Sequence, residues 1–205
     1  MFEFVERVVY INLNERVDRR TAVEAELLRV FPSEKVERFA AIRNKMGAIG
    51  CSLSHIAVLE RARAEGWANV LVVEDDMVWN LESLSESAAH AARIVNAGDW
   101  DLIMFGACYV DCTPEGRLRS GQTSTCYLIR QEYYDTLIAN LRESVAGLIR
   151  GGDYKVFALD QFWKRLQPTD RWWVVLPMAC YQRPGFSDIE GRIVDYRRYF
   201  FTEIR

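Results

Sequence analysis

Three adjacent carboxylates, Glu74, Asp75 and Asp76, are the residues of this chain whose types and spacing most clearly suit chemistry. They directly follow residues 69–73, a short apolar run typical of a buried strand. Neighbouring negative charges repel one another, and a divalent cation is the simplest way to offset that repulsion. In an extended chain, Glu74 and Asp76 point to one side and Asp75 to the other. The triplet therefore predicts a Mn²⁺ or Mg²⁺ site with Asp76 and Glu74 as ligands, against the alternative of a solvated acidic turn.

A second polar cluster follows the first apolar run of the chain, residues 8–13. It places arginines between a predicted buried strand and the start of a helix. Helix starts favour anions, and arginine forms paired hydrogen bonds with phosphate. The cluster therefore predicts an anion-binding site, and the alternative is a solvated loop followed by a first helical turn. The predicted binding residues are Asn12, Leu13, Arg16 and Arg19.

A third cluster, residues 47–55, begins with two glycines at the start of a predicted helix. Glycine allows a ligand to approach the backbone N–H groups of a first helical turn closely. We expect Gly50, Ser54 and His55 to border the ligand. The alternative for His55 is a core or surface histidine without a binding role. Because the chain has only two histidines, a histidine-rich metal site is excluded.

The elements that must position these clusters alternate between strands and helices. Short apolar runs predict strands at residues 8–13, 39–42, 69–73, 101–106, 123–128 and 172–176. Capping residues and helical periodicity predict helices at residues 21–30, 47–64, 83–95, 131–145 and 160–166. Thr21 and Glu24 have the spacing of a capping box at the start of the first helix. This alternation is typical of an α/β fold with a largely parallel sheet flanked by helices. Ligands bind such sheets at the carboxyl ends of the strands, so the first two clusters should share one edge.

Two later segments carry no clear periodicity. Residues 109–121 are polar and predict a loop, and the tail from residue 182 onward predicts irregular structure. In residues 192–205, arginines alternate with aromatic side chains, a composition that suits contact with an anionic membrane surface. The alternative for this tail is that Phe200 and Phe201 pack back onto the sheet.

Composition limits the classes of function. The formal net charge is -3 and the sequence pI is near 5.6, so there is no basic excess that would suit nucleic acid. Five cysteines without a CxxC pair predict free buried thiols in a reducing compartment rather than a disulfide framework. No segment resembles a signal peptide or a membrane span. We expect one domain, residues 1–205, that is cytoplasmic or peripheral to the inner face of a membrane.

Taken together and in order, these segments resemble glycosyltransferase family 25, the lipooligosaccharide biosynthesis glycosyltransferases. The resemblance rests on Ile-Asn-Leu followed by Arg and Asp-Arg-Arg in residues 11–20, on Gly-x-x-Gly-Cys-x-x-Ser-His in residues 47–55, and on an apolar strand ending in Glu-Asp-Asp at residues 70–76. Looser matches follow at residues 101–106, 127–129, 160, 182 and 187–189. Two features depart from the family. Cys126 stands where Ala is usual, and the chain is somewhat short, which implies a trimmed acceptor region.

The resemblance implies a GT-A type fold with a Rossmann-like sheet, in which residues 1–110 mainly bind the nucleotide-sugar and residues 111–205 mainly the acceptor. It also implies a UDP-sugar donor, often UDP-galactose, with Mn²⁺ as the usual metal and Glu74 and Asp75 among the binding residues. The acceptor would be a glycan or glycolipid such as lipooligosaccharide or another surface polysaccharide. Inversion at the anomeric carbon needs a general base for the acceptor hydroxyl. Asp160 is the first candidate, with a plain helix cap as its alternative role, and Asp188 is the second.

Two other functions suit the same pattern. A nucleotide-sugar hydrolase or a nucleotidyltransferase would use a similar sheet and a similar metal site. A catalytically inactive relative would keep the fold for carbohydrate recognition, although the intact Glu-Asp-Asp triplet argues against that reading.

Overall fold

A central sheet is built from the apolar runs of the sequence. The computed structural model describes residues 1–187, 189 and 191–200. Within this part of the chain, the sheet has six strands in the order β2-β1-β3-β8-β5-β9. The strands are β1 (Arg7–Asn12), β2 (Val36–Ala40), β3 (Asn69–Glu74), β5 (Leu102–Met104), β8 (Cys126–Arg130) and β9 (Trp172–Val174).

The sheet is mostly parallel, as the alternation of elements predicted. β1 pairs in parallel with β2 and β3, and β5 pairs in parallel with β9. β8 is inserted between β3 and β5 and runs antiparallel to both. In register, Ile11 on β1 lies between Phe39 on β2 and Glu74 on β3. The carboxyl ends of these three strands therefore meet at one edge of the sheet.

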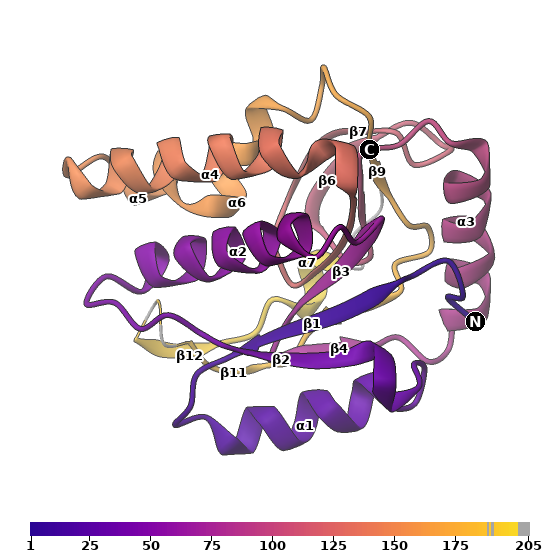
Figure 1. Cartoon of the computed structure of the whole chain (residues 1–205), viewed down its shortest axis with the longest axis horizontal. Coiled ribbons are helices and arrows are strands. Elements are labelled where there is room, and N and C mark those ends of the chain that lie inside the picture. Colours follow the sequence, from indigo (N-terminus) through magenta and orange to yellow (C-terminus); the bar gives the residue numbers. More distant parts are fainter. Residues whose placement is uncertain (188, 190, 201–205) are drawn as a thin grey trace.

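Helices cover both faces of the sheet, so the molecule has three layers (Figure 1). The helices are α1 (Val17–Leu27), α2 (Gly47–Ala64), α3 (Leu84–Ala97), α4 (Tyr134–Ile149), α5 (Tyr154–Phe157), α6 (Leu159–Phe162) and α7 (Arg197–Phe200). Alternate residues of β3 enter different cores, because successive strand side chains point to opposite faces. Val70 and Val72 pack with α2 and α4, whereas Leu71 and Val73 pack with α1 and α3. The near-continuous apolar run of β3 follows from this double burial.

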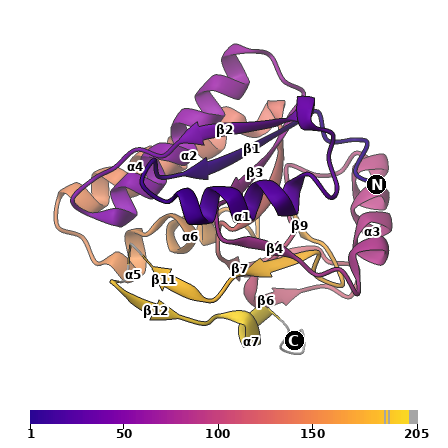
Figure 2. The same cartoon turned by 90° about the horizontal axis from the view of Figure 1, so that it is seen from below.

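Three small antiparallel sheets complete the fold. The pairs are β4 (Met77–Trp79) with β10 (Cys180–Gln182), β6 (Cys108–Cys112) with β7 (Leu118–Gln122), and β11 (Gly185–Ser187) with β12 (Arg192–Val194). β11 and β12 lie side by side near α7 (Figure 2). The prediction of a loop at residues 109–121 is therefore wrong, as is that of an irregular tail. Register shifts around Asp111 interrupt the pairing of β6 with β7. The side chains therefore do not alternate regularly between the two faces, and the sequence pattern did not indicate this hairpin.

The boundaries of α2 are those predicted, whereas α1 begins earlier than expected. α1 starts at Val17 with Arg16 in the N-cap position, so the predicted capping role of Thr21 is wrong. The Thr21 hydroxyl instead donates to the carbonyl of Val17 inside the helix, 3.1 Å away. Glu24, the other half of the predicted capping box, accepts hydrogen bonds from Tyr10 and Arg20. The early start brings Arg19 into the first helical turn, next to the end of β1.

The described part of the C-terminal tail packs onto the molecule. The side chain of Phe200 is buried in the larger hydrophobic core, where α7 contacts β6 and β10, and Tyr196 and Tyr199 pack against the same core. This supports the packing alternative for Phe200, while Phe201 lies outside the described residues. No helix in the described part of the chain is long and apolar enough to cross a membrane. All five cysteines are free thiols, and only Cys51 is partly exposed.

Candidate active site

The edge where the strands end carries a cavity of about 580 Å³. Part of its wall comes from the segments that follow the parallel strands β1, β2, β3 and β5 and from the segment that precedes antiparallel β8. These lining residues are Leu13 and Arg19 after β1, residues 41–44 after β2, residues 74–76 after β3, Cys108 and Tyr109 after β5, and Thr123 and Ser124 before β8. The first two polar clusters therefore lie at one edge, where the topology of the sheet predicted them.

Asp75 is held by two neighbours from the β1 side of the cavity. Its Oδ2 accepts a hydrogen bond from Asn12 Nδ2 at 2.7 Å, and its Oδ1 pairs with Arg19 Nη1 at 2.8 Å. Burial raises the pKa of Asp75 even though both neighbours act to lower it. Because both oxygens have partners, Asp75 is placed to orient Arg19 rather than to bind a further cation.

Asp76 is the carboxylate of the triplet whose hydrogen bonding is incomplete. Its Oδ2 accepts from Gln182 Nε2 at 3.0 Å and lies 3.3 Å from Arg19 Nη1. Its Oδ1 is buried and has no hydrogen-bond partner among the described residues. Burial, together with the negative charge of Glu74, raises the pKa of Asp76 to about 7. A cation beside Oδ1 would offset both effects, so the site fits a divalent ion that prefers oxygen ligands.

Glu74 turns toward the β8 side of the cavity. Its Oε1 accepts a hydrogen bond from Ser124 Oγ at 2.5 Å and lies 3.5 Å from His55 Nε2. Burial acts to raise the pKa of Glu74, but His55 and Ser124 outweigh it and the pKa lies below its usual value. The expectation that Glu74 and Asp76 point to one side and Asp75 to the other is wrong. β3 ends at Glu74 and the next two residues form a turn, so Asp75 and Asp76 share Arg19.

The predicted anion-binding cluster reaches the cavity through only some of its residues. Leu13 and Arg19 line the cavity, and Arg19 Nη2 also donates to the carbonyl of Phe186 at 2.6 Å. Asn12 is buried behind the lining, where it orients Asp75. Arg16 also lies outside the lining, and its guanidinium forms hydrogen bonds with Asp18. Arg19 is therefore the arginine of this cluster that lines the cavity, where it pairs with Asp75 and Asp76.

Gly50 and Ser54 shape the cavity wall. A Cβ at Gly50 would lie 2.5 Å from the carbonyl oxygen of Ile42, so only glycine allows the 41–44 segment to approach α2 this closely. Ser54 Oγ accepts from the backbone N–H of Ile42 at 2.8 Å and donates to the carbonyl of Gly50 at 2.7 Å. Both residues line the cavity, and their contacts hold the 41–44 segment of its wall against α2.

His55 is fully buried between the cavity and the core. Its ring stacks on Tyr127 with centroids 5.7 Å apart, and Nδ1 lies 2.9 Å from the Tyr127 hydroxyl. Nε2 makes no hydrogen bond to a described residue and faces Glu74. His55 is therefore a buried histidine rather than a surface one, and its binding role stays a prediction.

Asp160 lines the cavity as the second residue of α6. Ala158 occupies the N-cap position, so the alternative role of Asp160 as a helix cap is wrong. Its Oδ2 accepts from the backbone N–H of Thr123 at 3.2 Å, and burial raises its pKa. Asp188, the second candidate for a general base, lies outside the described residues.

Three contacts at the site, two of them with carboxylates, were not predicted, because each depends on long-range pairing. Gln182 reaches Asp76 because β10 pairs with β4, which places Gln182 opposite Met77. Ser124 reaches Glu74 because the segment before β8 lies beside the end of β3. Tyr127 meets His55 for the same reason. The only signal for Gln182 was its place in a loosely matched terminal segment, and no local pattern marked Ser124.

Comparison with known proteins adds only distant similarities. No protein-family model matches the chain, and no curated protein matches it. Among solved structures, the chain is similar to A197 from STIV, with 12% sequence identity and a TM-score of 0.49 over 92% of this chain and 93% of that one. It is also similar to a mannose-1-phosphate geranyltransferase from Thermus thermophilus, with 11% identity and a TM-score of 0.45 over 93% of this chain and 75% of that one.

Proposed function

We propose that this protein is a metal-assisted glycosyltransferase that takes a sugar from a nucleotide-sugar donor. The observation that carries the proposal is the buried Oδ1 of Asp76, which has no partner among the described residues and belongs to a carboxylate triplet lining the cavity. Arg19 lies beside the same carboxylates. A cavity of about 580 Å³ is within the range of about 300–1,000 Å³ that small-molecule sites occupy.

The donor we propose is a UDP-sugar, with UDP-galactose as the first choice. This choice rests on the resemblance to the lipooligosaccharide glycosyltransferases, which also implies a GT-A type fold, Mn²⁺ and inversion. The proposed acceptor is a glycan or glycolipid at the inner face of a membrane, such as lipooligosaccharide or another surface polysaccharide.

Each cavity residue has a distinct proposed role. Asp76 would hold the divalent ion, whose charge would stabilise the departing nucleoside diphosphate. Arg19 would meet the phosphate oxygens, and Asp75 would keep its guanidinium in place. Glu74 would contact the metal or the ribose.

Asp160 is the proposed general base. Its raised pKa makes it a better proton acceptor than an ordinary aspartate, and the Thr123 N–H fixes one of its oxygens. The ionised carboxylate would take the proton of the acceptor hydroxyl as that oxygen attacks the anomeric carbon and the bond from this carbon to the nucleoside diphosphate breaks. Asp188 remains the second candidate for this role.

The test is a panel of UDP-sugars, incubated with Mn²⁺ and with or without a sugar acceptor, with release of UDP as the readout. We expect release that needs both Mn²⁺ and the acceptor. Equal release without the acceptor would indicate a nucleotide-sugar hydrolase, and pyrophosphate exchange with UTP would indicate a nucleotidyltransferase. Thermal stabilisation by UDP and Mn²⁺ without any turnover would indicate an inactive binding protein. Full transfer in EDTA would overturn the metal-assisted mechanism.

A further inference from the structure

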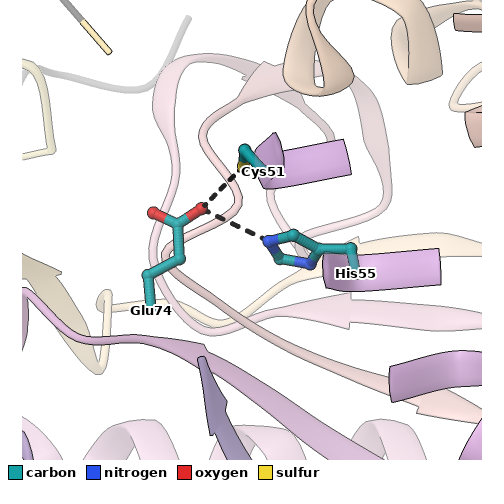
Figure 3. Close-up of side chains that lie close together, drawn as sticks. All are labelled: Cys51, His55 and Glu74. Carbon is teal, nitrogen blue, oxygen red and sulfur yellow. Dashed lines mark hydrogen bonds and ion pairs between the residues drawn. The ribbon is translucent and has the colours of Figure 1, made fainter. Parts of the chain in front are cut away.

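A thiol, an imidazole and a carboxylate converge on one point of the cavity wall. Cys51 and His55 lie one turn apart on α2, and both side chains point at Glu74 at the end of β3 (Figure 3). Glu74 Oε1 lies 4.0 Å from Cys51 Sγ and 3.5 Å from His55 Nε2. The three donor atoms all lie within 4.8 Å of one another.

We propose that Cys51, His55 and Glu74 form a Zn²⁺-binding site, separate in its chemistry from the oxygen-rich site at Asp76. Sulfur and imidazole ligands favour Zn²⁺ over Mn²⁺ or Mg²⁺. The inference goes beyond the proposed transferase function, because Zn²⁺ binding here does not require a nucleotide-sugar or any turnover.

Bonds of about 2.0–2.3 Å at the tetrahedral angle place the ligand atoms of an ion about 3.3–3.6 Å apart. The 3.5 Å between the carboxylate and the imidazole already has this value. The thiol lies 4.0 Å from the carboxylate and within 4.8 Å of the imidazole, so it would move toward both to close around an ion. The three residues also line the cavity, which leaves the fourth position of the ion open to water or to a ligand oxygen.

Two neighbours support the ligand atoms from behind. Tyr127 Oη lies 2.9 Å from His55 Nδ1, so an N–H on Nδ1 can donate to it and leave the Nε2 lone pair directed at the metal. The buried Nε2 makes no hydrogen bond to a described residue and lies 3.5 Å from Glu74 Oε1, so an ion bound between the two atoms would replace this contact. Ser124 Oγ donates to Glu74 Oε1 and holds the carboxylate in place.

Negative charges surround this point of the cavity. Glu74 belongs to the carboxylate triplet, and Asp160 lines the same cavity. Zn²⁺ binding would break the S–H bond of Cys51, release its proton to solvent and form a thiolate–metal bond, and the charge of the ion would offset the carboxylates around it.

Occupation of this site would also remove Glu74 from any role at the Asp76 site. Zn²⁺ should therefore oppose Mn²⁺ in a transferase reaction, and the thiol of Cys51 should be needed for that opposition.

The test uses Co²⁺ as a spectroscopic stand-in for Zn²⁺, added to the full chain without nucleotide. We expect the near-ultraviolet thiolate-to-cobalt charge-transfer band and the visible d–d bands of a tetrahedral ion, both abolished by one equivalent of Zn²⁺. Cys51→Ser should lose the charge-transfer band. The matched control is Cys108→Ser, which removes another thiol of the same cavity and should keep the band. The thermal unfolding midpoints of both variants without metal show whether each one folds.

Two further variants sharpen this test. Tyr127→Phe should weaken Zn²⁺ binding by about 10–100-fold, the usual effect of losing an outer-shell partner, and Cys51→Ser should weaken it more. Asp76→Asn should keep the cobalt spectrum even though it is expected to abolish sugar transfer, so the two proposals can fail separately. The absence of a charge-transfer band in the wild type, or an equal band in folded Cys51→Ser, would overturn the Zn²⁺ site.

Discussion

Asp76 and Asp101 are both buried, with relative exposures of 8% and 6%, but they lie at opposite edges of the central sheet. Asp76 follows the carboxyl end of β3, whereas Asp101 precedes β5, which runs in the same direction. Asp101 accepts hydrogen bonds on both oxygens from Arg171, through its backbone N–H and its guanidinium. Asp76 has one unpartnered oxygen and two carboxylates beside it in the chain. Burial alone therefore does not distinguish the two aspartates, and the incomplete set of partners among like charges is what makes Asp76 the candidate metal ligand.

The largest effect that we predict is on the activity of Asp76→Asn. The amide cannot supply the charge that holds the ion, so UDP release should fall by about 100-fold or more. Stability at neutral pH should be unchanged or higher, because a buried charge has been removed. UDP release and the urea midpoint of the same preparation measure both properties. Turnover near that of the wild type would remove Asp76 from the metal site.

At the other edge of the sheet, Asp101→Asn should lower the stability of the protein and leave its turnover unchanged. It removes charge-assisted hydrogen bonds with Arg171 and should lower the free energy of unfolding by about 1.5–3 kcal/mol. Turnover per folded molecule should match that of the wild type, because Asp101 is not among the residues that line the cavity. Urea unfolding and UDP release again provide the measurements. A loss of turnover in the folded variant would show that the two edges are not independent.

Substitution of the arginine partners of these aspartates should likewise affect UDP binding at one edge of the sheet and stability at the other. Arg19→Ala should weaken UDP binding by about 1.5–3 kcal/mol, because it removes the charge-assisted contact proposed for the diphosphate. Arg171→Ala should leave UDP affinity unchanged and lower stability instead. Arg16→Ala should have the smaller effect on affinity, since its guanidinium pairs with Asp18 outside the cavity lining. Calorimetry with UDP compares the three variants, and a larger loss in Arg16→Ala than in Arg19→Ala would reverse the assignment.

A smaller effect concerns the pH dependence of stability in the metal-free protein. The pKa of Asp76 is raised to about 7 in the folded protein, compared with about 3.9 in an unfolded chain. This carboxyl group therefore contributes stability that is fully present below about pH 4 and is lost as the pH rises through about 7. Urea unfolding in EDTA at about pH 5 and about pH 8 should show a smaller loss for Asp76→Asn than for the wild type. Equal losses in the two proteins would mean that the Asp76 carboxyl ionises normally.

Local patterns in the sequence predicted the elements whose residues are buried on both faces or bounded by glycine. The strand containing Val70–Val73 is buried on both faces. The helix from Gly47 to Ala64 begins at a glycine and is followed by Gly66, which has a positive φ. The edge where the polar clusters meet also followed from the alternation of strands and helices. The hairpin of β6 and β7 did not, because its residues are largely polar and its pairing is irregular.

The partners within the cavity needed the folded structure. Asp76 and Gln182 are 106 residues apart in the chain, and Glu74 and Ser124 are 50 apart. Those pairs depend on which strands lie next to each other, and spacing along the sequence carries no information on this. The same limit explains why Asn12, predicted to bind a ligand, lies behind the cavity wall and holds Asp75.

The most direct test of the central claim is calorimetric titration of UDP, with and without Mn²⁺, into the wild type, Asp76→Asn and Asp101→Asn. If the edge at the carboxyl end of β3 holds the metal and the nucleotide together, Mn²⁺ should strengthen UDP binding in the wild type and in Asp101→Asn and have no effect in Asp76→Asn. An equal Mn²⁺ effect in all three proteins, or UDP binding to the wild type that Mn²⁺ does not change, would contradict the proposed site.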